Sequence, residues 1–81
     1  MQPEDIQALI RSAIPGSEVQ VNVQGSHIAL IVVSSAFAGL STLKKQQMVY
    51  AALAAQFADG SIHAVDSMKT YTPEEWQLLQ Q

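Results

Sequence analysis

Cysteine is absent from this 81-residue chain, and charged residues are scarce. Without thiols the chain forms no disulfide, no thiolate metal site and no cysteine nucleophile. Charged residues make up 14% of the sequence and hydrophobic ones 48%, the opposite of the composition of a disordered chain. Seven acidic residues outnumber four basic ones, which gives a net charge of −3. A chain of this sign repels nucleic-acid phosphates overall, and it would need a local basic patch to bind them.

Long apolar runs are also missing. The run at residues 28–33 is far shorter than the roughly 20 residues that cross a bilayer as a helix. The first five residues are polar or acidic after Met1, without the basic and apolar regions of a signal peptide. A chain of 81 residues suits one domain with its own core. These features predict a single domain over residues 1–81 that lies in the cytoplasm and has no membrane contact.

The first half of the chain predicts a helix and a hairpin. Pro3 and the acids after it are typical of a helix start, and Pro15-Gly16 marks the end. Apolar residues at helical spacing give this helix a buried face: Ile6, Leu9, Ile10 and Ala13. Residues 19–23 then alternate valine with polar residues, the pattern of a strand with one wet face. After a turn at Gln24-Gly25, residues 28–33 predict a central strand buried on both faces.

The second half predicts two further helices around a third strand. Residues 41–58 favour one long helix, ended by Asp59-Gly60. Its buried stripe is expected to be Leu43, Tyr50, Leu53, Ala54 and Phe57, with Lys44, Lys45, Met48, Ala52 and Ala55 on the other side. Residues 62–71 suit a strand. Thr72-Pro73-Glu74-Glu75 is typical of a helix start, and the buried side of that helix would hold Trp76, Leu79 and, less clearly, Leu78. This order indicates an α+β fold with a small mixed sheet and helices packed on one face.

Several stretches together resemble the BolA family over nearly the whole chain. They are Ser26-His27-Ile28 leading into residues 31–34, the turn Phe37-Ala38-Gly39, and residues 62–65 followed by residues 71–76. Residues 43–50 are most similar to the acidic, short-loop bacterial branch called IbaG-like. The resemblance implies a type II KH-like fold with the order α-β-β-α-α-β-α and a three-stranded mixed sheet. In that fold the long helix is broken into two near its middle.

The resemblance also implies a function. BolA-like proteins pair with monothiol glutaredoxins, and the heterodimer shares a 2Fe–2S cluster. The glutaredoxin side supplies a cysteine and a bound glutathione, and the BolA-like side supplies a histidine that matches His63. The family's second ligand comes from the loop between the first two strands, which here is cut down to roughly Gln24-Gly25-Ser26. The remaining candidate is His27; a partner group or a water is the alternative.

The segment after His63 is one residue longer than the resemblance implies. A β-bulge at Asp66-Ser67 would absorb the extra residue and keep Val65, Met68 and Thr70 on one face.

Each histidine also has a plainer interpretation. Imidazole is a borderline donor suited to iron, and histidine ligates iron–sulfur clusters in Rieske centres. A histidine at a strand end can instead make an ordinary hydrogen bond, which is the alternative for His63. For His27 the alternative is a capping or packing role at the sheet edge.

The remaining singled-out residues favour a binding protein. Lys44, Lys45 and Met48 are expected on an exposed helix face that contacts a protein partner or nucleic acid, although two lysines give little affinity for phosphates. No second glycine follows Gly39 at the spacing of a KH loop, and Phe37 to Gly39 suits a tight turn. Trp76 is expected to be a core anchor.

The sequence shows no activated nucleophile and no oriented acid–base pair, so it predicts no enzyme. The main hypothesis is an adaptor, a monomer or weak homodimer alone, that acts with a glutaredoxin in iron–sulfur trafficking or stress signalling. The alternative is a DNA-binding transcriptional regulator.

Overall fold

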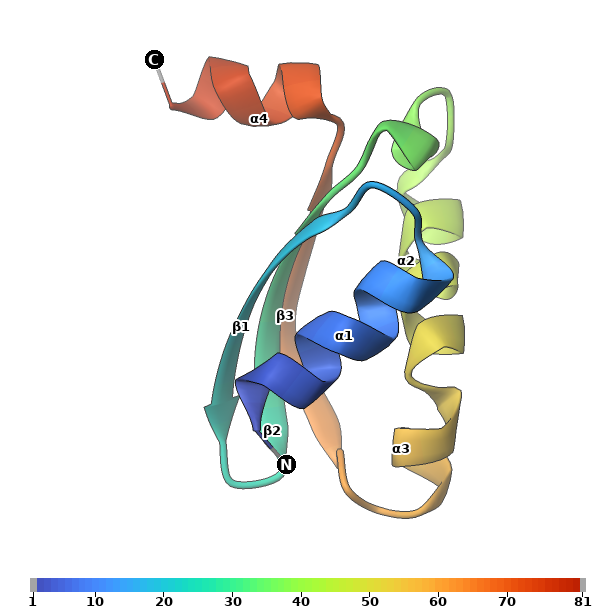
Figure 1. The fold of residues 1–81 in the computed structure, drawn as a ribbon, viewed down its shortest axis with the longest axis vertical. Coiled ribbons are helices and arrows are strands. Elements are labelled where there is room, and N and C mark those ends of the chain that lie inside the picture. The colour runs from blue at the N-terminus through green and yellow to red at the C-terminus, as the bar shows by residue number, and fades with distance from the viewer. Residues whose placement is uncertain (1, 81) are drawn as a thin grey trace.

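The structure is a computed structural model, and it describes residues 2–80. Its elements follow the order α1 (Pro3–Ala13), β1 (Glu18–Gln24), β2 (His27–Val33), the 3-10 turn η1 (Ser35–Phe37), α2 (Thr42–Ala52), α3 (Ala54–Ala58), β3 (Ala64–Tyr71) and α4 (Pro73–Leu79) (Figure 1). The α+β order that the family resemblance implies, with two helices between β2 and β3, is confirmed. Among residues 2–80 no helix has the length and apolarity to cross a membrane.

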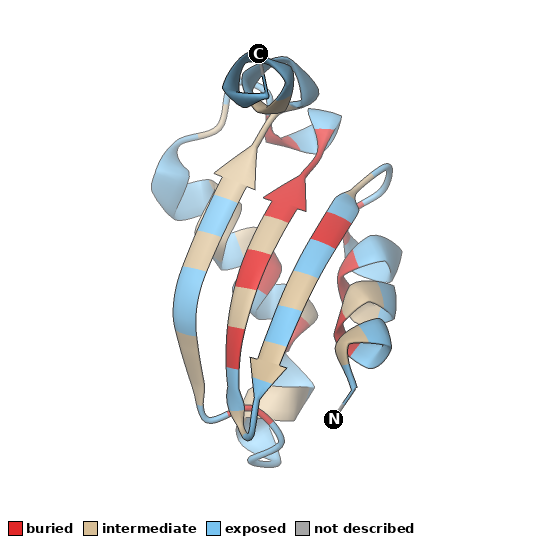
Figure 2. Ribbon diagram, turned by 90° about the vertical axis from the view of Figure 1, so that its left-hand side faces the viewer, coloured by how far each residue is buried: buried red, intermediate tan, exposed pale blue. Residues whose placement is uncertain are grey.

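The three strands form one mixed sheet with β2 in the centre (Figure 2). β1 pairs with β2 antiparallel, and β2 pairs with β3 parallel. Gln24 pairs with His27, so the hairpin closes through the two residues Gly25 and Ser26. Gly25 has a φ of 63°, a conformation that glycine adopts at no steric cost and that two-residue hairpins require. The parallel pairing brings the start of β3 to the start of β2, which sets up the candidate site.

One face of the sheet carries the core, because α1, α2 and α3 all lie on the same side of it (Figure 1). The core consists of Ile6, Ile10, Ile14, Val19, Ile28, Leu30, Val32, Phe37, Val49, Leu53 and Ile62. On the other face of β2, Ala29 and Ile31 are half-buried with no helix over them. The expectation that β2 is covered on both faces is therefore wrong; the run of apolar residues reflects its central place in the sheet.

The single long helix predicted for residues 41–58 is also wrong. Leu53 has φ −110° and ψ 11°, outside the helical range, and it separates α2 from α3. The break implied by the family resemblance is thus confirmed. Leu53 is fully buried, so the break lets the chain turn while this side chain stays in the core.

The buried stripe of α2 differs from the predicted one. Val49 is fully buried, and Met48 and Ala52 pack against the core. Leu43 and Tyr50, expected inside, are 63% and 44% exposed. Apolar residues occur on several sides of this helix, so their spacing did not determine which side faces the sheet.

The turn around Phe37 confirms the sequence prediction. Phe37 is fully buried at the end of η1, and Gly39 has a φ of 77°. The hydroxyl of Ser34 caps η1 by accepting a hydrogen bond from the Ala36 N–H at 3.1 Å. It also donates to the Pro15 carbonyl at 3.2 Å. This one side chain joins η1 to the connection between α1 and β1.

Helix α4 begins as predicted but does not return to the core. The Thr72 hydroxyl accepts from the Glu75 N–H, and the Glu75 carboxylate accepts from the Thr72 N–H at 2.8 Å, with Pro73 in the first turn. The helix projects beyond the end of the sheet (Figure 1). Trp76 is half-buried and packs on Tyr71 with ring centroids 5.6 Å apart.

The expected core role of Trp76 and the expected burial of Leu79 are therefore wrong. Leu79 is 60% exposed and Leu78 is 70% exposed. The cause is position: α4 starts two residues after the end of β3, where the core has already ended.

Candidate functional site

The two histidines of the chain lie at the same end of the sheet. His27 is the first residue of β2, and its Cα is opposite that of Ala64, the first residue of β3. The backbone N–H of His63 donates to the Ser26 carbonyl at 2.8 Å, which extends the pairing by one residue toward this end. The parallel register thus brings together two candidate residues that are far apart in the sequence.

The His63 side chain is exposed and faces the loop between α3 and β3. A Cβ built on Gly60 would lie 3.7 Å from His63 Nε2, so the absence of a side chain at Gly60 leaves this nitrogen open. In that loop the Ser61 N–H donates to Asp59 Oδ1 at 2.8 Å. Hydrogen bonds from the side chain and backbone of Ser61 hold the pKa of Asp59 below its ordinary value. Within residues 2–80 the hydrogen bond of His63 is made by its backbone, and its imidazole stays accessible.

The His27 imidazole is oriented by a carboxylate. His27 Nδ1 lies 2.9 Å from Asp66 Oδ1, and the two side chains are 52% and 56% exposed. Asp66 comes from β3, at the place where the pairing with β2 shifts by one residue. The His27 ring is therefore half exposed and bonded to a carboxylate at the end of the sheet.

The register shift is the β-bulge that the sequence predicted. Ile28 pairs with Val65, but Ala29 pairs with Ser67, so Asp66 is an extra residue in β3. Beyond the bulge Met68 packs against the core, as Val65 does before it. The bulge therefore keeps the apolar residues of β3 on the side of the helices and Asp66 on the exposed side.

These side chains offer part of a coordination sphere. Two exposed imidazoles share one end of the sheet, and imidazole nitrogen suits iron. Among residues 2–80 no group of three or more histidine, aspartate or glutamate side chains is placed to hold a metal ion. The donor set fits an iron–sulfur cluster in which a second molecule supplies the other ligands, and it does not fit a metal site built by this chain alone.

The two lysines separate instead of forming one basic surface. Lys44 is exposed, whereas the Lys45 side chain is 11% exposed with its Nζ 3.8 Å from Glu75 Oε1. The predicted exposed position of Lys45 is therefore wrong. The pKa of Glu75 lies below its ordinary value because its carboxylate accepts hydrogen bonds from the Thr72 N–H and hydroxyl, with a smaller contribution from Lys45.

Met48 packs partly on the core and also reaches the outer side of α2. There a shallow depression of about 400 Å³ is lined by Leu40, Lys44, Gln47, Met48 and Ala51. Lys44 and Met48 thus share a surface, and Lys45 is not part of it.

Comparison with known proteins identifies the family. A family model described as BolA-like protein matches residues 3–75. The chain belongs to the BolA-like family. The acid stress protein IbaG of Escherichia coli (strain K12) is 46% identical over 76 residues, covering 94% of this chain and 89% of that protein. The resemblance to the family and to its IbaG-like branch is therefore confirmed.

Solved structures of BolA-like proteins have the same fold. A bolA protein homologue from Coxiella burnetii aligns with a TM-score of 0.81 and 32% identity, covering 95% of this chain and 97% of that one. Yeast Fra2 aligns with a TM-score of 0.67 and 32% identity, covering 94% and 84%. The BolA domain of SufE1 from Arabidopsis thaliana aligns with a TM-score of 0.79 and 26% identity, covering 90% and 93%.

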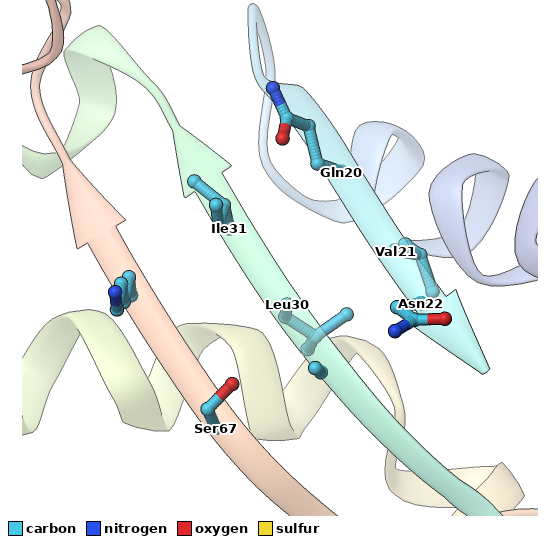
Figure 3. Close-up of a pocket in the computed structure, with 8 residues that line it drawn as sticks. Gln20, Val21, Asn22, Leu30, Ile31 and Ser67 are labelled. Atoms are coloured by element: carbon cyan, nitrogen blue, oxygen red, sulfur yellow. The ribbon is translucent and has the colours of Figure 1, made fainter. Parts of the chain in front are cut away.

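The open face of the sheet in this BolA-like chain carries a second shallow depression of about 250 Å³ (Figure 3). It is lined by Gln20, Val21, Asn22, Ala29, Leu30, Ile31, Ser67 and Lys69. This lining includes neither histidine of the chain, and Lys69 is its one charged residue. The histidine end of the sheet is the better candidate site.

Asp66 is the residue that sequence reasoning missed as a functional candidate. It was predicted only as part of a bulge, and it is 39 residues from His27 along the chain. The signal that could have found it is the bulge itself, because bulges often redirect a side chain next to a functional site.

Proposed function

We propose that this BolA-like chain is an adaptor that binds a monothiol glutaredoxin and contributes histidine ligands to a shared 2Fe–2S cluster. The observation that carries the proposal is the pair of exposed imidazoles, His27 and His63, at one end of the sheet of a chain without cysteine. Two nitrogen donors are too few to hold a cluster, so the complete site needs a partner.

Within this proposal His63 is the principal ligand. Its backbone is fixed by the hydrogen bond to Ser26, and its ring faces the open space beside Gly60. His27 is the second donor from this chain. The glutaredoxin would supply a cysteine thiolate and its bound glutathione. The cluster is cargo or a redox signal, and no catalytic step is assigned to the residues of this chain.

The proposed cellular role is iron–sulfur cluster trafficking or signalling under iron or redox stress. The Escherichia coli relative is named as an acid stress protein, which favours a stress-related role. Similarity to Fra2 and to the BolA domain of SufE1 is in line with a domain that works with other proteins.

Co-expression with a monothiol glutaredoxin tests the proposal. The purified pair should be coloured, with a visible spectrum that depends on glutathione. His63→Ala should lose or change this spectrum, whereas Gln24→Ala, an exposed change beside the hairpin turn, should leave it as in the wild type. An unchanged spectrum for His63→Ala would remove this residue as a ligand. If the wild-type chain forms no complex with the glutaredoxin, the adaptor function is wrong.

Nucleic-acid binding is the weaker alternative. Lys44 projects into solvent, but Lys45 is directed to Glu75, and the net charge of −3 opposes binding to phosphates. Affinity for duplex DNA measured over a salt series separates the two functions, because a phosphate-dependent binder weakens steeply as salt rises. Absence of binding at low salt would end this alternative.

A further inference from the structure

The contact between His27 and Asp66 joins two strands at the candidate site. Its 2.9 Å separation places the Oδ1 of a carboxylate directly at His27 Nδ1. Both side chains are about half exposed, and an exposed pair of this kind contributes little to folding stability. The pair lies at the end of the sheet where the backbone of His63 also lies, and this position calls for a different explanation.

The β-bulge is what makes this contact. In β3, Ser67 takes the place opposite Ala29, and Asp66 is left as an extra residue between Val65 and Ser67. No residue of β2 pairs with Asp66, because Ile28 pairs with Val65 and Ala29 pairs with Ser67. Asp66 therefore lies beside the first residues of β2, which include His27. Bulges redirect side chains in this way, and here the redirected side chain reaches the imidazole at the start of β2.

The chemistry of the contact determines which nitrogen of His27 is available. A carboxylate accepts a hydrogen bond, so neutral His27 must carry its proton on Nδ1 to make the contact. Its Nε2 then has a free lone pair. Histidines that bind metals commonly donate their other N–H to a carboxylate, which fixes the orientation of the ring and makes the ligating nitrogen more basic.

We infer that Asp66 is a positioning residue: it holds His27 with the proton on Nδ1 and so makes Nε2 the second ligand atom that this chain offers to iron. The ligand part of this inference rests on the proposed function. The position of the proton does not, since it follows from the contact in the chain by itself.

The position of the proton is measured on the full chain without iron. Long-range ¹H–¹⁵N correlations of the labelled protein distinguish the two neutral forms of an imidazole ring and so report which ring nitrogen carries the proton. Because the chain has two histidines, His63→Ala assigns the signals of His27. We expect the proton on Nδ1 in the wild type and in Ser67→Ala, and a shift toward Nε2 in Asp66→Ala. A wild-type proton mainly on Nε2 overturns the inference.

The ligand role is measured on the pair with a monothiol glutaredoxin. The rate of cluster loss to a chelator should rise about 10- to 100-fold in Asp66→Ala, the usual effect of removing a partner of a metal-binding histidine. Ser67→Ala changes the neighbouring bulge residue and should leave the rate unchanged. Equal rates in the two variants overturn the role of Asp66 in positioning His27 as a ligand. Failure of the wild-type pair to form any cluster rejects the proposed function instead, and the proton position in the free chain is still decided by the first experiment.

Discussion

Ser34 should contribute more to stability than any other hydroxyl of the chain. Its side chain is fully buried, and the described residues include no other buried polar residue. The hydroxyl accepts from the Ala36 N–H and donates to the Pro15 carbonyl. Replacement by alanine removes both hydrogen bonds and leaves the volume of the core nearly unchanged.

The magnitude follows from the two contacts. Loss of a serine cap costs about 1 kcal/mol, and loss of a further hydrogen bond costs about 1 kcal/mol. Ser34→Ala should therefore lower the free energy of unfolding by about 2 kcal/mol. A domain of this size has a total of roughly 4 to 12 kcal/mol, so the loss is a large share of it.

Urea unfolding followed by circular dichroism measures this difference, with Ser35→Ala as the matched control. Ser35 is the next residue and is exposed, so its replacement should change the free energy of unfolding by less than about 0.5 kcal/mol. Equal slopes against urea would show that the unfolded states are comparable. If Ser34→Ala and Ser35→Ala unfold at the same urea concentration, the buried hydrogen bonds of Ser34 do not stabilise the fold and the reasoning is refuted.

Two other predictions concern the cap of α4 and the hairpin turn. The folded-state pKa of Glu75 is lowered, so the stability from its ionised cap is present above the unfolded pKa and is lost as the pH falls through the folded pKa. The midpoint temperatures of thermal unfolding of the wild type and Glu75→Ala should therefore differ at neutral pH and approach each other as the pH falls to about 3. A difference that stays constant over this range would contradict the reasoning. Gly25→Ala should lose about 1 kcal/mol in urea unfolding because φ is positive, and Ser26→Ala, at the other turn position, which has no positive φ, should lose less. Equal losses would argue against backbone strain as the cause.

The strands, the hairpin turn and the start of α4 were predictable because they depend on local signals. Alternation in β1, the glycine of the hairpin turn and the Thr72–Glu75 cap each act within a few residues, and each is found where the sequence indicates it. The bulge followed from the family resemblance, which implies one residue fewer after His63 than this chain has, and one extra residue in a paired strand must leave the pairing.

The helix faces were not predictable by the same means. α2 carries Leu43, Met48, Val49 and Tyr50 on different sides, so the spacing fits more than one buried face, and packing against the sheet selects Val49. Helix α4 also has an apolar side. Because this helix starts beyond the core, Leu79 does not pack against the core and stays exposed.

The candidate site was predictable residue by residue but not as an arrangement. His63 and His27 could be identified as candidates from the sequence. That they lie at the same end of the sheet depends on the parallel pairing of β2 with β3. The contact of His27 with Asp66 needs that pairing and the bulge together. No local pattern contains this information.

The two ends of the sheet differ in a way that matters for handling the protein. α1 starts at the end of the sheet where His27 lies, and α4 extends from the opposite end (Figure 1). A polyhistidine tag joined ahead of Pro3 would bring extra imidazoles next to the native pair and compete with them for iron. A tag or fluorescent label joined after α4 would lie at the end of the sheet opposite to the histidines. Spectra of the cluster and pull-down experiments with the glutaredoxin are therefore best made with a tag at that position.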